Sequence, residues 1–365
     1  MHSLDTFIES NNADGGCEEG PGYWGHAVAA YFDSLCTLYD MSGGKINVFD
    51  NEYIRKIGEY IVDFNIADNL YLNFADARYK IDHDGALIKD YGDRCGSAAM
   101  SAQGAFLDKA SVGAHHANLY RALRSVTTPD VPDCEQAVAK TVAYYDVIKV
   151  MVARETDNKK QGFFLGIKGG NNGELHNHDD VGCFVVHHNG EAVIIDAGGG
   201  RYMNSQFRTH ENSWNRYSGA HNVPLINGFE EGTGKEYRSK NEVLEGKCLT
   251  LDITEAYPAQ ANLERFIRRA EIKDGSVVIT DDIALKSEGE VDFVFMTVGE
   301  PKLANGKILL DAGRVMHYPS GLVASVEKMD TEACGADRRS NAEPVLHRIH
   351  LKAKTKGGTF VFTIK

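Results

Sequence analysis

The feature that most constrains the fold is a change of residue pattern near residue 158. Before this point, apolar residues recur at steps of three and four, which is the spacing of amphipathic helices. After the polar run 158–162, β-branched and aromatic residues form short blocks separated by Gly, Asn and Asp, as is typical of strands and turns. We therefore predict an α+β multidomain chain, with a helical domain at residues 1–158 and an antiparallel β-sandwich at residues 159–365.

The helical part is predicted to contain five helices in sequence. The first follows Tyr23 and ends before Gly43, and Asp50 is the predicted N-cap of the second. The third and fourth are predicted over 96–107 and 115–123, and the fifth opens after Pro132. The apolar positions assigned to the fifth helix are Val138, Val142, Tyr145 and Ile148. Consecutive helices with short links indicate a bundle or an α/α toroid, here a partial one.

The second part is predicted to consist of many short strands. Strands that follow one another at close spacing with turn residues between them favour an antiparallel sandwich. The predicted strand segments include 163–167, 181–187, 192–196, 276–280, 291–298, 307–311 and 359–364.

Composition excludes several classes of protein. The net charge of −13 argues against nucleic acid as a partner, because phosphate binding needs a basic face. No apolar run reaches the roughly 18 residues of a membrane-spanning helix. The N-terminus has no signal-peptide pattern, which predicts a cytoplasmic protein, or a periplasmic or secreted one if the chain is a processed form. The seven cysteines are scattered and contain no CxxC, which indicates neither a disulfide framework nor a thiolate zinc site.

Histidines are concentrated in one stretch of the predicted sandwich. Six of the 14 histidines fall within the 46 residues 176–221. His176 and His178 are two residues apart, so on a strand both would face the same side. Asp196 ends a predicted strand and His221 stands at another predicted strand start. Two imidazoles and a carboxylate suit zinc, and other divalent metals remain open.

A second unusual segment lies near the N-terminus, at residues 14–25. It combines five glycines, a proline and three acidic residues with the aromatic pair Tyr23 and Trp24, which opens the first predicted helix. Taken alone, this pattern is best interpreted as a glycine-rich turn followed by an ordinary amphipathic helix.

Together these segments resemble a known family. The stretches 169–180, 193–198 and 218–228 resemble the heparinase II/III-like polysaccharide lyases, a family of alginate and heparin lyase type that combines a helical toroid with a β-sandwich. The segment 14–25 resembles the loop that carries the catalytic tyrosine of these enzymes. The resemblance covers most of the chain and is looser after about residue 235.

The resemblance implies a role for each matching residue. Tyr23 and His176 would be the catalytic acid/base pair. His178, Asp196 and His221 would hold a divalent metal, most simply a structural Zn²⁺.

The resemblance also implies a partner, an anionic uronic-acid polysaccharide or oligosaccharide. Glu19 and Trp24 would line the sugar cleft, and Arg208 is predicted to contact the substrate carboxylate on the basis of charge and location. Because the chain as a whole is acidic, the cleft would need locally positive charge. A homodimer is left open.

The implied reaction is β-elimination, which leaves a 4,5-unsaturated uronate end. Relatives neutralise the uronate carboxylate with an Asn or His well upstream of the tyrosine, whereas only 22 residues precede Tyr23 here; His115 and His116 are substitute candidates. This difference keeps two alternatives open. One is a catalytically weak carbohydrate-binding relative with a structural metal, and the other is a metal-dependent hydrolase or cupin-like enzyme built on the same ligands.

Overall fold

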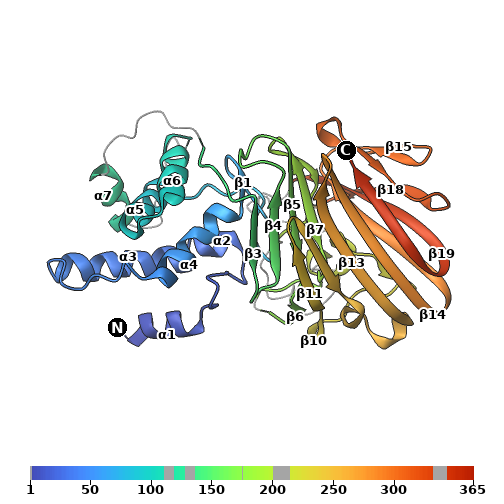
Figure 1. The fold of residues 1–365 in the computed structure, drawn as a ribbon, viewed down its shortest axis with the longest axis horizontal. Coiled ribbons are helices and arrows are strands. Elements are labelled where there is room, and N and C mark those ends of the chain that lie inside the picture. Colours follow the sequence, from blue (N-terminus) through green and yellow to red (C-terminus); the bar gives the residue numbers. More distant parts are fainter. Residues whose placement is uncertain (1, 111–118, 128–135, 175, 200–213, 332–342) are drawn as a thin grey trace.

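The protein is built in three layers, which Figure 1 shows side by side: a group of helices, a five-stranded sheet and a ten-stranded sheet. The computed structural model describes residues 2–110, 119–127, 136–174, 176–199, 214–331 and 343–365. Helices come first in the chain and antiparallel strands follow, so the predicted β-sandwich is confirmed. The toroid remains a prediction. Within the described ranges, no helix is both long and apolar enough to cross a membrane.

The helical layer follows the predicted amphipathic stripes in its first part. The N-cap of the second predicted helix is Asn51 rather than Asp50, since the Asn51 side chain accepts a hydrogen bond from the Tyr53 amide at 2.8 Å. The first half of the predicted fourth helix lies outside the described residues. The helices are α1 (His2–Ser10), α2 (Pro21–Trp24), α3 (Ala27–Met41), α4 (Glu52–Asp63), α5 (Gly85–Cys95), α6 (Ala98–Ala110) and α7 (Leu119–Thr127).

The predicted fifth helix is wrong. Its apolar residues Val142 and Tyr145 belong to strand β3 (Val142–Tyr145), in which buried and partly buried residues alternate. A short apolar run does not separate a helix from a strand by spacing alone, and the tyrosines and β-branched residue here favour the strand. The first two strands of the five-stranded sheet therefore precede residue 158, which places sheet residues on both sides of the proposed domain boundary.

The five-stranded sheet is buried on both faces. Along β4, Val150 and Val152 pack against the helices, whereas Met151 and Ala153 pack against the ten-stranded sheet. The strands follow the order β3, β4 (Val150–Arg154), β5 (Phe163–Lys168), β7 (Phe184–His188) and β8 (Glu191–Ile194), and all neighbours are antiparallel. The helical layer and the sandwich thus share this sheet as a common wall.

The ten-stranded sheet is organised around two long strands, β14 (Ser276–Thr297) and β19 (Val345–Ile364), which pair along almost their whole length. Buried apolar residues of both strands form the core between the two sheets. The other strands are β9 (Leu225–Ile226), β11 (Lys240–Glu245), β12 (Cys248–Asp252), β13 (Leu263–Lys273), β15 (Lys302–Ala304), β16 (Lys307–Leu309), β17 (Val315–His317) and β18 (Val323–Asp330).

Two short pairs of antiparallel strands lie outside these sheets. Strand β1 (Asn65–Ala67) pairs with β2 (Leu70–Tyr71), and β6 (Asn171–Asn172) pairs with β10 (Gly234–Arg238). The first pair leads into the connection between β2 and α5, and the second holds one end of the loop that carries two of the histidines.

The inter-sheet core can be tested at Phe362. This ring is 0% exposed and lies 5.0 Å from the ring of Phe293 and 5.1 Å from that of Phe295. We expect Phe362→Ala to lower the free energy of unfolding by about 3–5 kcal/mol, because it removes a large buried side chain and leaves a cavity. The neighbouring Val361→Ala, at a position 42% exposed, should change it by less than about 1 kcal/mol. Urea denaturation compares the two, and equal losses would contradict this packing.

Candidate functional site

Tyr23 is positioned by the loop that precedes α2. Gly20 has φ +85°, and a Cβ there would lie 2.7 Å from the carbonyl oxygen of Phe74. Only glycine fits both the backbone angle and the close approach. Pro21 then occupies the first turn of α2, where its missing N–H has no consequence. The loop therefore sets Tyr23 directly against the segment between β2 and α5.

His176 and His178 lie in the loop between β6 and β7 and not on a strand, so the predicted strand geometry for this pair is wrong. His176 has φ +54°, a left-handed conformation that is uncommon for a residue other than glycine. The His-x-His spacing nevertheless brings both rings to the same neighbour, because the loop turns between them.

Buried polar side chains hold this loop in place. The Lys168 ammonium donates to Asn177 Oδ1 at 2.9 Å and to Asp180 Oδ1 at 2.5 Å. Burial alone would lower the pKa of Lys168, but the Asp180 carboxylate outweighs it and raises the pKa above its ordinary value. At the start of the loop, Asn172 donates to the buried Glu231 carboxyl at 2.8 Å. The loop is therefore anchored at both ends by groups that water does not reach.

Tyr23 and His176 come together although they are far apart in the sequence. Their ring centroids lie 4.6 Å apart, with the planes tilted by 40°. Glu19 is also near, with Oε1 at 3.7 Å from His176 Nε2. The His176 side chain remains 31% exposed, so the pair is open to a ligand from solvent. A phenol and an imidazole this close together could both contact one bound molecule, which acid/base chemistry needs.

Asp76 is a site residue that the sequence analysis missed. Its Oδ2 lies 2.8 Å from His176 Nδ1, and its Oδ1 lies 3.3 Å from His178 Nε2. One carboxylate thus contacts both histidines of the His-x-His pair. The signal in the sequence is weak, since Asp76 is a single acidic residue in the mostly apolar stretch 72–77, far along the chain from His176 and His178.

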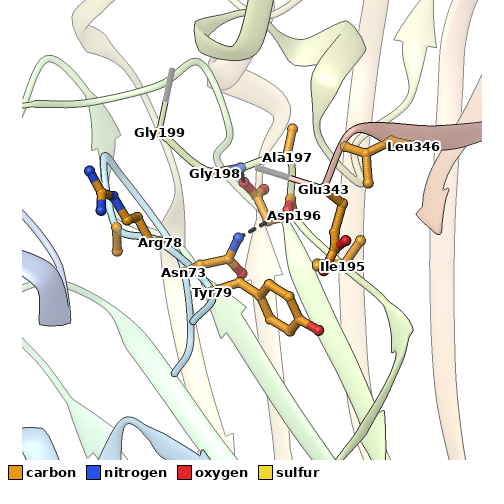
Figure 2. Close-up of a pocket in the computed structure, with 11 residues that line it drawn as sticks. Asn73, Arg78, Tyr79, Ile195, Asp196, Ala197, Gly198, Gly199, Glu343 and Leu346 are labelled. Carbon is orange, nitrogen blue, oxygen red and sulfur yellow. Dashed lines mark hydrogen bonds between the residues drawn. The ribbon is translucent and has the colours of Figure 1, made fainter. Parts of the chain in front are cut away.

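The segment that carries Asp76 lies between the tyrosine loop and the residues that follow β8, among them Asp196. Figure 2 shows Asn73 pointing to Asp196, and its amide donates to the Asp196 carbonyl oxygen at 2.9 Å. On the same side, a Cβ at Gly199 would lie 2.6 Å from the Asp76 carbonyl oxygen, so the two backbones pass too close for a side chain. Asp76 consequently has little freedom to move.

The predicted metal ligands form one buried cluster. His178, Asp196 and His221 are 1%, 2% and 0% exposed, and each offers a ligand atom within 4.8 Å of the others. Asp196 follows β8, and His221 follows the short 3-10 turn Ser218–Ala220 in extended backbone rather than at a strand start.

The hydrogen bonds of the cluster fit a cation. Asp196 Oδ2 lies 2.7 Å from His221 Nδ1, whereas His221 Nε2 and His178 Nδ1 are buried without a hydrogen-bond partner. Burial opposes a charge on His221, but Asp196 outweighs it and raises the pKa of His221 to about 9. A carboxylate beside two imidazoles with unused nitrogens is a donor set that suits a divalent metal such as zinc. On binding, the metal would take the place of a proton on the cluster.

Trp24, predicted to line the sugar cleft, does not join the site. Trp24 is 1% exposed and donates its indole N–H to the Ile57 carbonyl at 2.8 Å, so its ring packs within the helical layer and offers little surface to a sugar. Trp24 also borders a cavity of about 140 Å³ beside α2, together with His83 and Arg121. The predicted substrate contact Arg208 lies outside the described residues, as do His115 and His116.

One family model matches this chain. Its description is heparinase II/III-like, C-terminal, and the match covers residues 145–345, which is more than half of the chain. This range includes the cluster His178, Asp196 and His221 and the catalytic candidate His176, whereas Tyr23 and Asp76 precede it. No curated protein matches the sequence.

Several solved structures share the fold. A heparinase III matches with a TM-score of 0.73 at 17% identity, over 100% of this chain and 54% of that chain. A heparan sulfate lyase from Pedobacter heparinus matches with a TM-score of 0.71 at 14% identity, over 100% and 55%. A xanthan lyase from Paenibacillus matches more weakly, with a TM-score of 0.51 at 10% identity, over 94% and 38%. This chain therefore spans about half the length of the heparinase structures.

The cation site can be tested by thermal unfolding. Zn²⁺ at about 100 times its dissociation constant should stabilise the protein by about 2.7 kcal/mol, because it binds only the folded cluster. His178→Ala should abolish this gain and the bound zinc measured by elemental analysis. His317→Ala, at an exposed position of β17, should keep both. A full gain in the His178→Ala protein would remove His178 from the ligand set.

A pH prediction concerns Glu231, which supports the histidine loop. Burial raises the pKa of Glu231 from 4.5 to about 8. Between these values the folded state binds more protons than the unfolded state, so this residue lowers stability as pH rises from about 4.5 to 8. Glu231→Gln should therefore gain stability over the natural protein at pH 9 but not at pH 5. Exposed Glu245→Gln should show no such difference. Urea unfolding at both pH values measures it, and a gain independent of pH would contradict the assignment.

Proposed function

This chain belongs to the heparinase II/III-like family, and from this premise we propose that it is a polysaccharide lyase that cleaves a uronic-acid glycan by β-elimination. The observation that carries the proposal is the meeting of Tyr23 and His176, with ring centroids 4.6 Å apart, on a surface open to solvent. Each residue comes from a different layer of the fold, so their proximity is a property of the folded chain and not of local sequence.

The reaction needs three things from the protein. In a 4-linked uronate the C5 proton is weakly acidic, so a base must take it while a positive or hydrogen-bonding group offsets the carboxylate charge. The C5–H electron pair then forms the C4–C5 double bond as the C4–O4 bond breaks. An acid finally donates a proton to the departing O4. Products are a 4,5-unsaturated uronate end and a new free hydroxyl.

Tyr23 and His176 supply the base and the acid in this proposal. A phenol close to both the C5 proton and O4 can serve as base, acid or both, and His176 takes the role that the tyrosine leaves, according to the stereochemistry of the sugar. Asp76 accepts a hydrogen bond at His176 Nδ1, which leaves Nε2 to face Glu19 and the open side. The geometry thus supports proton transfer through Nε2.

The offset of the uronate charge must come from a residue other than Glu19 or Asp76, since both are acidic. Arg208 stays a proposal for this role. Glu19, 28% exposed beside His176, is placed to accept a hydrogen bond from a sugar hydroxyl.

The burial of the ligand cluster favours a structural cation. His178, Asp196 and His221 are each at most 2% exposed in the described part of the chain, so a metal held by them, most simply Zn²⁺, would be shielded from solvent. When bound, it would fix the loop that carries His176 by cross-linking that loop to the segments after β8 and before β9. The same burial disfavours a hydrolase or cupin-like enzyme, which needs an open metal position.

The names of the matched proteins bear on the substrate class. Heparinase III, heparan sulfate lyase and xanthan lyase are all named for acidic polysaccharides, which favours an anionic uronan for this chain. A second candidate function, glycan binding with little turnover, is favoured by one observation: the chain spans about half of the length of the heparinase structures.

An absorbance assay separates the two functions. The lyase should generate the ultraviolet absorbance of an unsaturated uronate from at least one member of a panel of uronan oligosaccharides. Tyr23→Phe should lower turnover at least about 100-fold, because it removes the phenolic proton, with little effect on folding or glycan binding. Tyr318→Phe, the same change far from the site, should be neutral. Binding without absorbance by the natural protein would favour the second function, and full activity of Tyr23→Phe would remove Tyr23 from the mechanism.

A further inference from the structure

We propose that Asp76 is a positioning residue that connects the cation site to His176, so that occupancy of the cluster His178, Asp196 and His221 determines which nitrogen of His176 carries its proton. The proposal rests on the lyase function only for the role of His176. The link itself is a statement about one carboxylate and two imidazoles, and it can be tested without a substrate.

The geometry is that of one carboxylate shared by two rings. Asp76 Oδ2 is 2.8 Å from His176 Nδ1, and Asp76 Oδ1 is 3.3 Å from His178 Nε2. The Asp76 side chain is only 12% exposed, so water competes little for either oxygen. The Gly20 and Gly199 contacts described above confine the backbone of this segment, so a rotation of the carboxylate at one ring also moves the oxygen at the other.

Hydrogen-bond roles follow from this sharing. An ionised carboxylate only accepts, so the nitrogen that faces it must carry the hydrogen. For His178 this places the hydrogen on Nε2 and leaves the lone pair on Nδ1, which is buried and has no hydrogen-bond partner in the structure. A lone pair on a buried imidazole nitrogen is what a metal ligand needs, and a carboxylate on the opposite nitrogen is the common outer partner of such ligands.

The same carboxylate then sets His176. With Oδ1 engaged by His178, Oδ2 accepts from His176 Nδ1, and the lone pair of His176 lies on Nε2, on the side of Glu19 and the open surface. Without a cation a second tautomer of neutral His178 competes, with the hydrogen on Nδ1 and a lone pair on Nε2, and that lone pair repels Asp76 Oδ1 instead of donating to it. The carboxylate then turns away from His178, its alignment with His176 Nδ1 becomes weaker, and the hydrogen position on His176 is less strictly defined.

A simpler reading gives Asp76 a role in holding the loop only. The two readings differ at Asp76→Asn, which keeps size and shape but replaces one acceptor oxygen by an NH₂ donor. Asparagine can accept from one histidine only, and the other histidine must present a lone pair to the amide. A residue that only fills space would tolerate this change, whereas a shared acceptor would not.

The experiment measures zinc affinity and the state of His176 directly. Zinc affinity is obtained by competition with a chromophoric chelator, for the natural protein, Asp76→Asn and the control Asp82→Asn. Asp82 lies on the same connection, is exposed, and accepts from Asn69 at 2.9 Å. We expect Asp76→Asn to lose about 10- to 100-fold in zinc affinity, as for other outer partners of histidine ligands, and Asp82→Asn to be unchanged.

The second readout is the ¹⁵N chemical shift of the His176 ring, assigned by its absence in His176→Gln. In the natural protein, zinc should shift His176 fully to the form with hydrogen on Nδ1, although His176 is not a ligand. In Asp76→Asn zinc should no longer have this effect. In a lyase assay, Asp76→Asn should lower kcat more than it changes KM. Formate, a small carboxylate, should partly restore kcat in Asp76→Ala.

Both arms can overturn the proposal. An Asp76→Asn protein with unchanged zinc affinity would show that Asp76 does not support His178. A ¹⁵N shift of the His176 ring that does not change when zinc is added to the natural protein would disprove the link. This result does not depend on the folding of any variant. A protein without lyase activity that still shows both effects would disprove the proposed function and retain the link, so the two failures are distinguishable.

Discussion

The position of Tyr23 relative to His176 depends on a sheet that has no face toward water. Val150 and Val152 of β4 pack against the helices, and Met151 and Ala153 pack against the ten-stranded sheet. A strand buried on both faces cannot change register without moving every side chain into the wrong layer. The helical layer is therefore held against the sandwich by close packing, and this packing also fixes the position of the loop that carries Tyr23.

The site itself is built on loops, which usually position side chains less sharply than strands or helices do. In this protein, buried polar contacts hold the loop side chains in defined positions. Lys168 holds Asn177 and Asp180, and Asn172 holds Glu231, at distances of 2.5–2.9 Å. Breaking one partner of such a buried charge pair is costly, because the remaining charge stays out of water. The histidine loop can thus adopt the uncommon left-handed angle at His176 and still be defined.

The sequence predicted the sandwich and the histidine-rich stretch, because β-branched blocks and histidine spacing are local signals, and the family resemblance then separated His176 from the ligand candidates His178, Asp196 and His221. The predictions from sequence were wrong or incomplete where contacts between distant segments determine the structure. Tyr145 was assigned to a helix because a short apolar run has no unique period, and it lies in β3. Asp76 could not be found from spacing, since 100 residues separate it from His176 and the contact depends on packing between layers. Trp24 follows Tyr23 directly, yet one ring faces the site and the other is buried, which only the turn of α2 determines.

The shared wall between the layers has a consequence for how the molecule comes apart. Removing the helices would expose the apolar face that carries Val150, Val152, Phe164 and Val185, and removing the sandwich would leave the helices without their largest packing partner. The five-stranded sheet contributes residues both to the core between the sheets and to the core beneath the helices. Two cores that share a sheet are coupled, so the protein should melt in a single cooperative transition despite its mixed architecture, and a proteolytic cut between helices and sheet should leave the helical side without a stable fold.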